Sequence, residues 1–413
     1  MRFLHLADVH LDTAFAGRSE SLRRRLREAS RQAFTGAVAC ALEEEVHALL
    51  VAGDLFDGDR LSFGTEAFLL EETRRLEAAG VAVVYACGNH DPGEEGARAR
   101  VPWPGNVTVV AGATPVRVPV HARDGTLVGH VTAAGHPRRR ETADLSRAFP
   151  RPGAGELPEV ALLHTQVVSA RGTEEHDAYA PSELSWLRES GYDYWALGHV
   201  HLRQCLAEEP AIHYPGNLQG RTPRERGAKG GLLVDLRGGG PPRVEFRAFA
   251  PVRFETLEVR ALQDERTLSG LVSRVAREWE EARRAEASAA CEWILRVVLA
   301  GPTPLWKELE GEEDLSALAR ELAEALGVLD VHVWAHAAHP VLSPADHEGR
   351  QDVLGEALRL LDEVRSGRAL LPGVRAEELA GVRTGEDVQA WVRDLLQDAE
   401  GEVLTRLLRA AER

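Results

Sequence analysis

The stretch at residues 2–10 reads RFLHLADVH, an apolar run typical of a buried strand that is followed at once by Asp8 and His10. The same succession of an apolar strand and then side chains that bind metal recurs at residues 48–57, 81–91, 160–164 and 194–201. Polar side chains at the carboxyl ends of neighbouring strands in an open sheet can converge on one crevice. The sequence therefore predicts a parallel sheet with a site at one of its edges.

The candidate ligands each offer an oxygen or an imidazole nitrogen that binds divalent cations. They are Asp8, His10, Asp54, Asn89, His164, His199 and His201. Two cations held about 3.5 to 4 Å apart can clamp the attacking and leaving oxygens of a displacement at phosphorus, and such a pair needs a bridging carboxylate. Asp54 follows a glycine in a tight turn and is the natural bridge. One such residue alone is more often a cap or turn former, but five motifs together favour a two-metal site.

The alternation of elements predicts an α/β fold. Over the first 100 residues, helical patterns at about 19–45 and 63–79 separate the apolar strands, which indicates a parallel sheet covered by helices. From 107 to 249, shorter strands with Gly and Pro turns and a helix near 181–189 predict a second, more antiparallel sheet. We therefore expect a four-layer αββα sandwich.

The 413 residues suggest two or three domains, and we place boundaries by composition and pattern. Residues 1–250 form the sandwich, 251–334 a small α/β domain, 335–348 a proline-bearing linker, and 349–413 C-terminal helices at about 351–365 and 384–412. These last helices carry apolar residues at three-to-four spacing. This apolar stripe could pack on the chain itself or dock on a partner protein. Because the linker separates the helices from the α/β domain, it slightly favours docking on a partner.

Charge and hydropathy limit the classes of partner. The net charge of −16 argues at first against a nucleic acid, but residues 1–250 hold 29 Lys and Arg against 33 Asp and Glu, and the remainder 20 against 32. Polyanion binding stays possible for the first part and is disfavoured for the tail. No stretch approaches a membrane span and the first residues read as a strand rather than a signal peptide, so we expect a cytoplasmic protein with no membrane partner.

The motifs D-x-H, G-D-x-x-D, G-N-H-D, a lone His and G-H-x-H, in this order, resemble those of the calcineurin-like metallophosphoesterase superfamily over residues 1 to about 250. The resemblance implies two divalent cations. One would be held by Asp8, His10, Asp54 and His201. The other would be held by Asp54, Asn89, His164 and His199. It also implies that His90 is a catalytic histidine that holds no metal and acts on the leaving oxygen, and that the catalytic carboxylate Asp57 orients it.

Longer stretches at residues 2–12, 194–201 and 214–221 are similar to the SbcD-type DNA repair nucleases, and especially to their YhaO-like branch. This resemblance implies manganese-dependent hydrolysis of DNA phosphodiesters, as an exonuclease and also an endonuclease. It implies an SbcC-type SMC-like ATPase as partner, a homodimer, and a second domain that acts as a cap and helps to admit DNA. Asp57 stands where archaeal and eukaryotic relatives carry histidine and bacterial ones aspartate, which places the chain in the bacterial branch.

Two groups of arginines are candidates for DNA phosphate contacts, although a solvated basic face explains them equally simply. They are Arg221, Arg224 and Arg226, and the run Arg138, Arg139 and Arg140. Two other functions compete with a nuclease. One is a phosphatase or phosphodiesterase that acts on a small nucleotide, against which the C-terminal extension argues. The other is a DNA-tethering subunit without activity, which has no need of a leaving-group acid.

Overall fold

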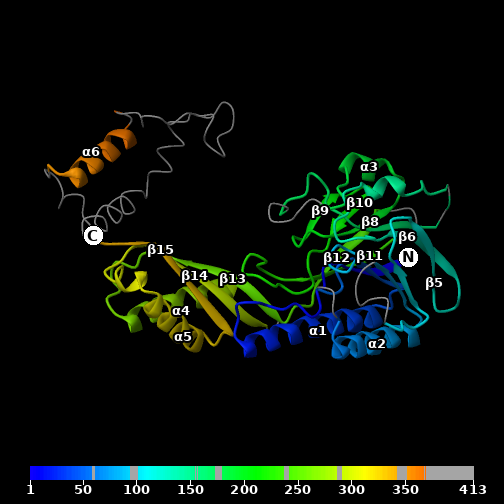
Figure 1. The fold of residues 1–413 in the computed structure, drawn as a ribbon, viewed down its shortest axis with the longest axis horizontal. Coiled ribbons are helices and arrows are strands. Elements are labelled where there is room, and N and C mark those ends of the chain that lie inside the picture. The colour runs from blue at the N-terminus through cyan, green and yellow to red at the C-terminus, as the bar shows by residue number, and fades with distance from the viewer. Residues whose placement is uncertain are drawn as a thin grey trace. The chain divides into compact units, whose positions relative to one another are not determined.

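The computed structural model describes residues 1–57, 61–93, 101–153, 155, 157–172, 179–236, 241–285, 291–341, 351–366 and 368. The chain divides into two compact units. The first comprises Met1–Phe254 and Ala290–Trp293, and the second Glu255–Ala289 and Ile294–Arg413. Figure 1 shows their elements. Among the described residues, no helix is both long and apolar enough to cross a membrane.

The first unit contains two six-stranded sheets. The first sheet has the order β12-β11-β1-β2-β3-β4, with strands Arg243–Ala248, Gly230–Asp235, Arg2–Leu6, Ala48–Ala52, Ala82–Ala86 and Val107–Val110. Strands β1 to β4 are parallel, while β11 and β12 form an antiparallel edge. The parallel part is the one that the β-α-β-α-β pattern predicts.

The second sheet has the order β5-β6-β7-β8-β10-β9, with strands Val116–His121, Leu127–Ala134, Glu159–His164, Tyr194–Gly198, Ala211–Tyr214 and Gln204–Ala207. Its four central strands β6, β7, β8 and β10 are parallel, and only β5 and β9 are antiparallel to their neighbours. The prediction of a more antiparallel sheet was therefore wrong. Two crossovers, which contain the 3₁₀ helix η2 (Leu145–Ala148) and α3 (Leu184–Glu189), return the chain to the same end of the sheet.

Helices cover the outer face of each sheet (Figure 1). Helix α1 (Glu20–Glu43) begins after Ser19 and α2 (Phe63–Ala78) after Ser62, and both serines accept a backbone N–H of the first turn. Alternate strand residues such as Leu49 and Val51 pack with these helices, whereas Leu50 packs between the two sheets. On the other face of the second sheet, a third hydrophobic cluster packs against α3 and η2. These layers confirm the predicted αββα sandwich.

The second unit follows the predicted order of strand, helix, strand, helix, strand. It contains the greater part of β13 (Val252–Val259) and of β14 (Glu292–Pro302), together with α4 (Leu268–Ala285), the 3₁₀ helix η3 (Glu308–Glu310), α5 (Glu312–Leu326) and β15 (Asp330–His339), and the sheet order is β13-β14-β15. β15 continues to His339, into the segment that we expected to be a linker, because Ala335 and Ala338 continue its buried face.

Helix α6 (Val353–Arg365) is the described part of the predicted C-terminal helices. Leu354, Leu361 and Val364 of its apolar stripe are buried within the chain. The helix that we predict at 384–412 lies outside the described residues, as do residues 342–350 of the linker segment.

Candidate two-metal site

The candidate ligands lie in loops at the carboxyl ends of five strands, or end the strand itself. Strands β1, β2 and β3 of the first sheet lead to Asp8 and His10, to Asp54 and to Asn89, while β7 and β8 of the second sheet lead to His164, His199 and His201. Because the two sheets pack face to face, the loops of both meet at one end. All seven side chains belong to buried residues.

The backbone turns sharply at these ligands. Asp8, His10, Asp54 and His199 have φ values of 50, 49, 53 and 104°, in a region that residues other than glycine seldom adopt. Gly53 has φ 82°, and a Cβ there would stand 2.3 Å from His164 Nδ1. Such strain persists where the surrounding structure fixes it and is typical of functional sites.

Three side chains form one group of donor atoms. His10 Nε2 and His201 Nε2 face each other at 3.2 Å. Asp8 Oδ1 lies 3.7 Å from His201 Nε2 and 4.0 Å from His10 Nε2. The buried donor atoms of an aspartate and two histidines thus converge on one point.

A second group forms around Asn89. Its Oδ1 lies 2.9 Å from His164 Nε2 and 3.2 Å from His199 Nδ1. Asp54 Oδ2 lies between the groups, 3.5 Å from His164 Nε2 and 3.7 Å from His10 Nε2. Asp54 is therefore the candidate ligand whose carboxylate could reach cations in both groups.

The electrostatics of the cluster fit cations. Burial and the neighbouring Asp54 raise the pKa of Asp8 well above its usual range, and burial raises the pKa of Asp54 to about 7. Burial also lowers the pKa of His10 and His164 far below the usual 6.5, which keeps both imidazoles in the neutral form that binds metal. The pKa values of the two buried carboxylates stay raised although Arg221 lies near them, so the site has room for more positive charge, which divalent cations would supply. The residues present fit a pair of divalent cations.

Hydrogen bonds outside the ligand set fix its orientation. His164 Nδ1 donates to the carbonyl of Ala52 at 2.9 Å, which leaves Nε2 for the site. His136 Nε2 donates to the His164 carbonyl at 2.7 Å, and Glu225 Oε1 accepts from His201 Nδ1 at 2.6 Å. Sequence reasoning missed His136 and Glu225, because neither lies in one of the five motifs.

Asp91, the last residue of the G-N-H-D motif, is a buried acceptor of hydrogen bonds from two loops. It accepts hydrogen bonds from the backbone N–H of Gly88 at 2.7 Å and of Leu55 at 2.5 Å, and from the Tyr85 hydroxyl at 2.5 Å. One buried carboxylate therefore ties the loop of Asp54 to the loop after β3.

The predicted acid and its partner lie together beside the cluster. His90 Nδ1 donates to Asp57 Oδ1 at 2.7 Å. Asp57 Oδ2 also accepts from Thr13 Oγ1 at 2.9 Å and from Arg221 Nη1 at 3.2 Å. Burial opposes ionisation of Asp57, but the hydrogen bond from His90 and the charge of Arg221 lower its pKa to about 2.

The charge of His90 follows from the same contacts. Burial lowers the pKa of His90, but the hydrogen bond to Asp57 and the charge of Asp54 outweigh it and raise the pKa overall. The His90 ring lies edge to face with His10, with ring centroids 4.8 Å apart. His90 is thus held by Asp57 next to the cluster of candidate ligands, which is the place that the predicted acid would need.

Of the six candidate arginines, the structure brings Arg221 to the site through its contact with Asp57. The other five are exposed: Arg138, Arg139, Arg140, Arg224 and Arg226.

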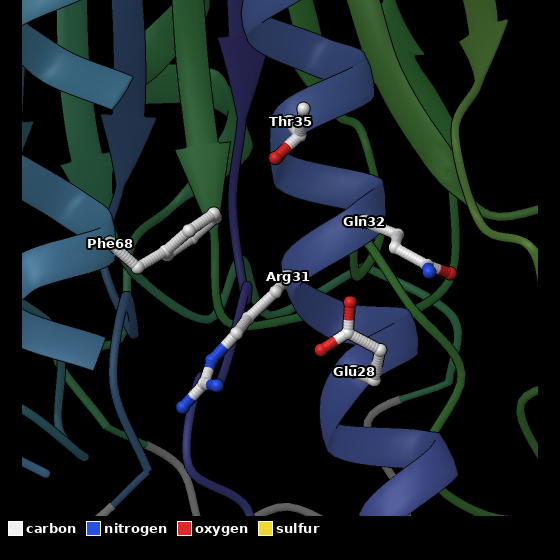
Figure 2. A pocket seen from close by; sticks show the side chains of 5 residues that line it. All are labelled: Glu28, Arg31, Gln32, Thr35 and Phe68. Carbon is white, nitrogen blue, oxygen red and sulfur yellow. The ribbon is translucent and has the colours of Figure 1, made fainter. Parts of the chain in front are cut away.

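A hollow of about 350 Å³ lies elsewhere, between α1 and α2, and Figure 2 shows Glu28, Arg31 and Phe68 among its lining residues. None of the seven candidate ligands lines it.

Comparison with known proteins identifies the class. The family profile of the calcineurin-like phosphoesterases matches residues 1–203, and the chain belongs to this metallophosphoesterase family of hydrolases, which use divalent metals. An uncharacterised metallophosphoesterase of Bacillus subtilis, YhaO, is 32% identical over 334 residues, 78% of either chain. Both the superfamily and the SbcD/YhaO-like resemblance are thereby confirmed.

Further relatives carry names from DNA metabolism. The DNA double-strand break repair protein Mre11 of Aeropyrum pernix is 31% identical over 264 residues, which are 58% of this chain and 59% of that protein. A component of the nuclease SbcCD of Rhodobacter capsulatus is 28% identical over 299 residues, 59% and 68% of the two chains. A solved dimetal phosphatase from Danio rerio is 13% identical with a TM-score of 0.36 over 59% of this chain and 98% of its own, a likeness too low to bear on function.

Proposed function

We propose that this chain is the nuclease subunit of a DNA repair enzyme and hydrolyses DNA phosphodiester bonds with two manganese ions. The observation that carries the proposal is the hydrogen bond of 2.7 Å between His90 and Asp57 beside a bridged cluster of cation ligands. A site that only bound metal for folding would have no use for a protonated histidine held in this way.

Each side chain has a role in this proposal. Bound cations supply positive charge to the phosphate and to the nucleophile that attacks it. Asp54 would hold both cations. Asp8, His10 and His201 would complete one coordination sphere, and Asn89, His164 and His199 the other.

The proton for the leaving oxygen comes from His90. Asp57 accepts its Nδ1–H, which directs Nε2 away from the carboxylate and leaves that nitrogen to donate to the leaving group. Arg221 donates a hydrogen bond to the other oxygen of Asp57. Of the arginines that could contact DNA phosphates, it is the one that we place nearest to the scissile phosphate. The exposed arginines Arg138 to Arg140, Arg224 and Arg226 would contact phosphates farther along the DNA.

DNA as the substrate is supported by the relatives, two of which are named a double-strand break repair protein and a nuclease component. We extend this to an exonuclease that also cuts internally, works as a homodimer in the cytoplasm, and associates with an SbcC-type SMC-like ATPase. Residues 251–334 would act as a cap that admits DNA. The predicted helix at 384–412 would dock on the partner.

The test of this proposal compares the hydrolysis of DNA with that of a small phosphodiester under the same conditions. End-labelled linear duplex DNA and a small phosphodiester, bis-p-nitrophenyl phosphate, are each incubated with the full chain and Mn²⁺. We expect nucleotides to be released from DNA, and this release to be lost in Asp54→Ala and after chelation. Hydrolysis of small phosphoesters with none of DNA would refute the nuclease and favour a small-molecule phosphodiesterase. DNA binding that survives chelation without any cleavage would favour a tethering subunit.

A further inference from the structure

The loop that follows the last ligand motif touches the site at three points. Glu225 Oε1 accepts from His201 Nδ1 at 2.6 Å, and Lys229 Nζ donates to the His201 carbonyl at 3.1 Å. Arg221 Nη1 donates to Asp57 Oδ2 at 3.2 Å. The loop therefore holds a candidate ligand by its side chain and its backbone, and also contacts the carboxylate that holds the acid.

Glu225 organises this loop as well. Its second oxygen, Oε2, accepts the backbone N–H groups of Arg221 and, at 3.1 Å, of Thr222. The side chains of Glu225 and His201 are 13% and 9% exposed, so water competes little for these contacts. One carboxylate thus binds a candidate ligand with one oxygen and fixes the turn that carries Arg221 with the other.

We propose that Glu225 is a positioning residue that couples the cation cluster to the His90–Asp57 pair. A neutral imidazole has one N–H, and because His201 Nδ1 faces Glu225, the lone pair remains on Nε2. That nitrogen lies 3.2 Å from His10 Nε2, inside the cluster. The proposal rests on the two-metal site described above, but it does not require DNA to be the substrate.

The need for a carboxylate follows from a count of acceptors. Glu225 has two oxygens and accepts from one side chain and two backbone groups. A glutamine of the same shape has one oxygen, and its NH₂ group would face either His201 or the backbone N–H groups of the loop. Glu225→Gln therefore breaks one side of the coupling while the volume is kept.

The experiment titrates the metal-free full chain with Mn²⁺ in a calorimeter. We expect Glu225→Gln to weaken at least one of the two binding events by about 10- to 100-fold, the usual cost of losing a partner of a ligand histidine. Arg221→Gln should leave both affinities unchanged while it slows phosphodiester hydrolysis. Glu208→Gln is the matched control, since it removes the same charge from an exposed side chain and should change neither property. Unchanged Mn²⁺ affinities together with unchanged phosphodiester hydrolysis in a folded Glu225→Gln protein would overturn the proposal.

A second measurement does not depend on the variant. In the unaltered chain loaded with Zn²⁺, which is diamagnetic, ¹⁵N NMR of labelled histidines should show His201 protonated at Nδ1. A cation on Nδ1 would overturn the proposal even if Glu225→Gln failed to fold, which thermal unfolding of the metal-free protein reveals. If these results hold while the unaltered chain does not cut DNA, the nuclease proposal fails and the role of Glu225 stands.

Discussion

Replacing Asp57 with asparagine tests the proposed acid most sharply. Asp57 accepts hydrogen bonds from His90 at 2.7 Å, Thr13 at 2.9 Å and Arg221 at 3.2 Å. An asparagine has one acceptor oxygen and no charge, so His90 loses both its fixed orientation and the carboxylate that raises its pKa. General acid catalysis contributes about 10²- to 10⁴-fold, and because the histidine itself remains we expect the lower end. A fall of about 10²-fold in kcat corresponds to about 2.7 kcal/mol of transition-state stabilisation.

The assay is Mn²⁺-dependent hydrolysis of end-labelled duplex DNA across a pH series. Activity should decline on the alkaline side as His90 loses its proton, and this decline should begin at lower pH in Asp57→Asn because the pKa of His90 is no longer raised. Asp124→Asn, the same change at an exposed position, serves as the control. A kcat within about threefold of the unaltered protein, with an unchanged alkaline limb, would refute the assignment of His90 and Asp57.

Three further predictions concern the scaffold of the site. Tyr85→Phe removes the hydroxyl that donates to buried Asp91 at 2.5 Å and should lower the free energy of unfolding by about 1 to 3 kcal/mol in denaturant titrations. Gly53→Ala places a Cβ 2.3 Å from His164 Nδ1 at a φ of 82°, so Mn²⁺ affinity measured by calorimetry should fall, and an unchanged affinity would show that the loop can relax. Burial lowers the pKa of His5 from 6.5 to about 3, so between these values the unfolded chain binds a proton that the folded chain does not. The metal-free protein should therefore lose stability as the pH falls from 6.5 toward 3, by up to roughly 1.4 kcal/mol per pH unit from this group, and less steeply in His5→Asn.

The sequence predicts the ligand loops well because each one follows a run of apolar residues that must be buried. Leu49 and Val51 pack with the helices while Leu50 packs between the sheets, so the strand before Asp54 is apolar on both faces. The glycine before Asp54 predicts the tight turn there, and the structure shows positive φ at both Gly53 and Asp54. Local pattern was sufficient for these features.

Other features depend on contacts between segments that are distant in the chain, and these could not be predicted from the sequence. Glu225 and His136 lie 24 and 28 residues from the histidines that they contact, and nothing in their neighbours marks them. The strands of the second sheet are parallel because long crossovers join them, and these crossovers contain only the short helices η2 and α3, so the sequence shows no clear β-α-β alternation there. The sequence does not predict the end of β15, because residues 335–339 lie directly before Pro340 in the proline-bearing segment 335–348 that we expected to be a linker.

The central claim is that seven side chains hold two cations bridged by Asp54, and electron paramagnetic resonance during a Mn²⁺ titration tests it most directly. The metal-free full chain should take up two equivalents and give the spectrum of two exchange-coupled ions. Asp54→Asn should abolish the coupling, because the carboxylate that lies within 3.7 Å of donor atoms in both groups is gone. A single equivalent, or two ions whose coupling is unaffected by Asp54→Asn, would contradict the account.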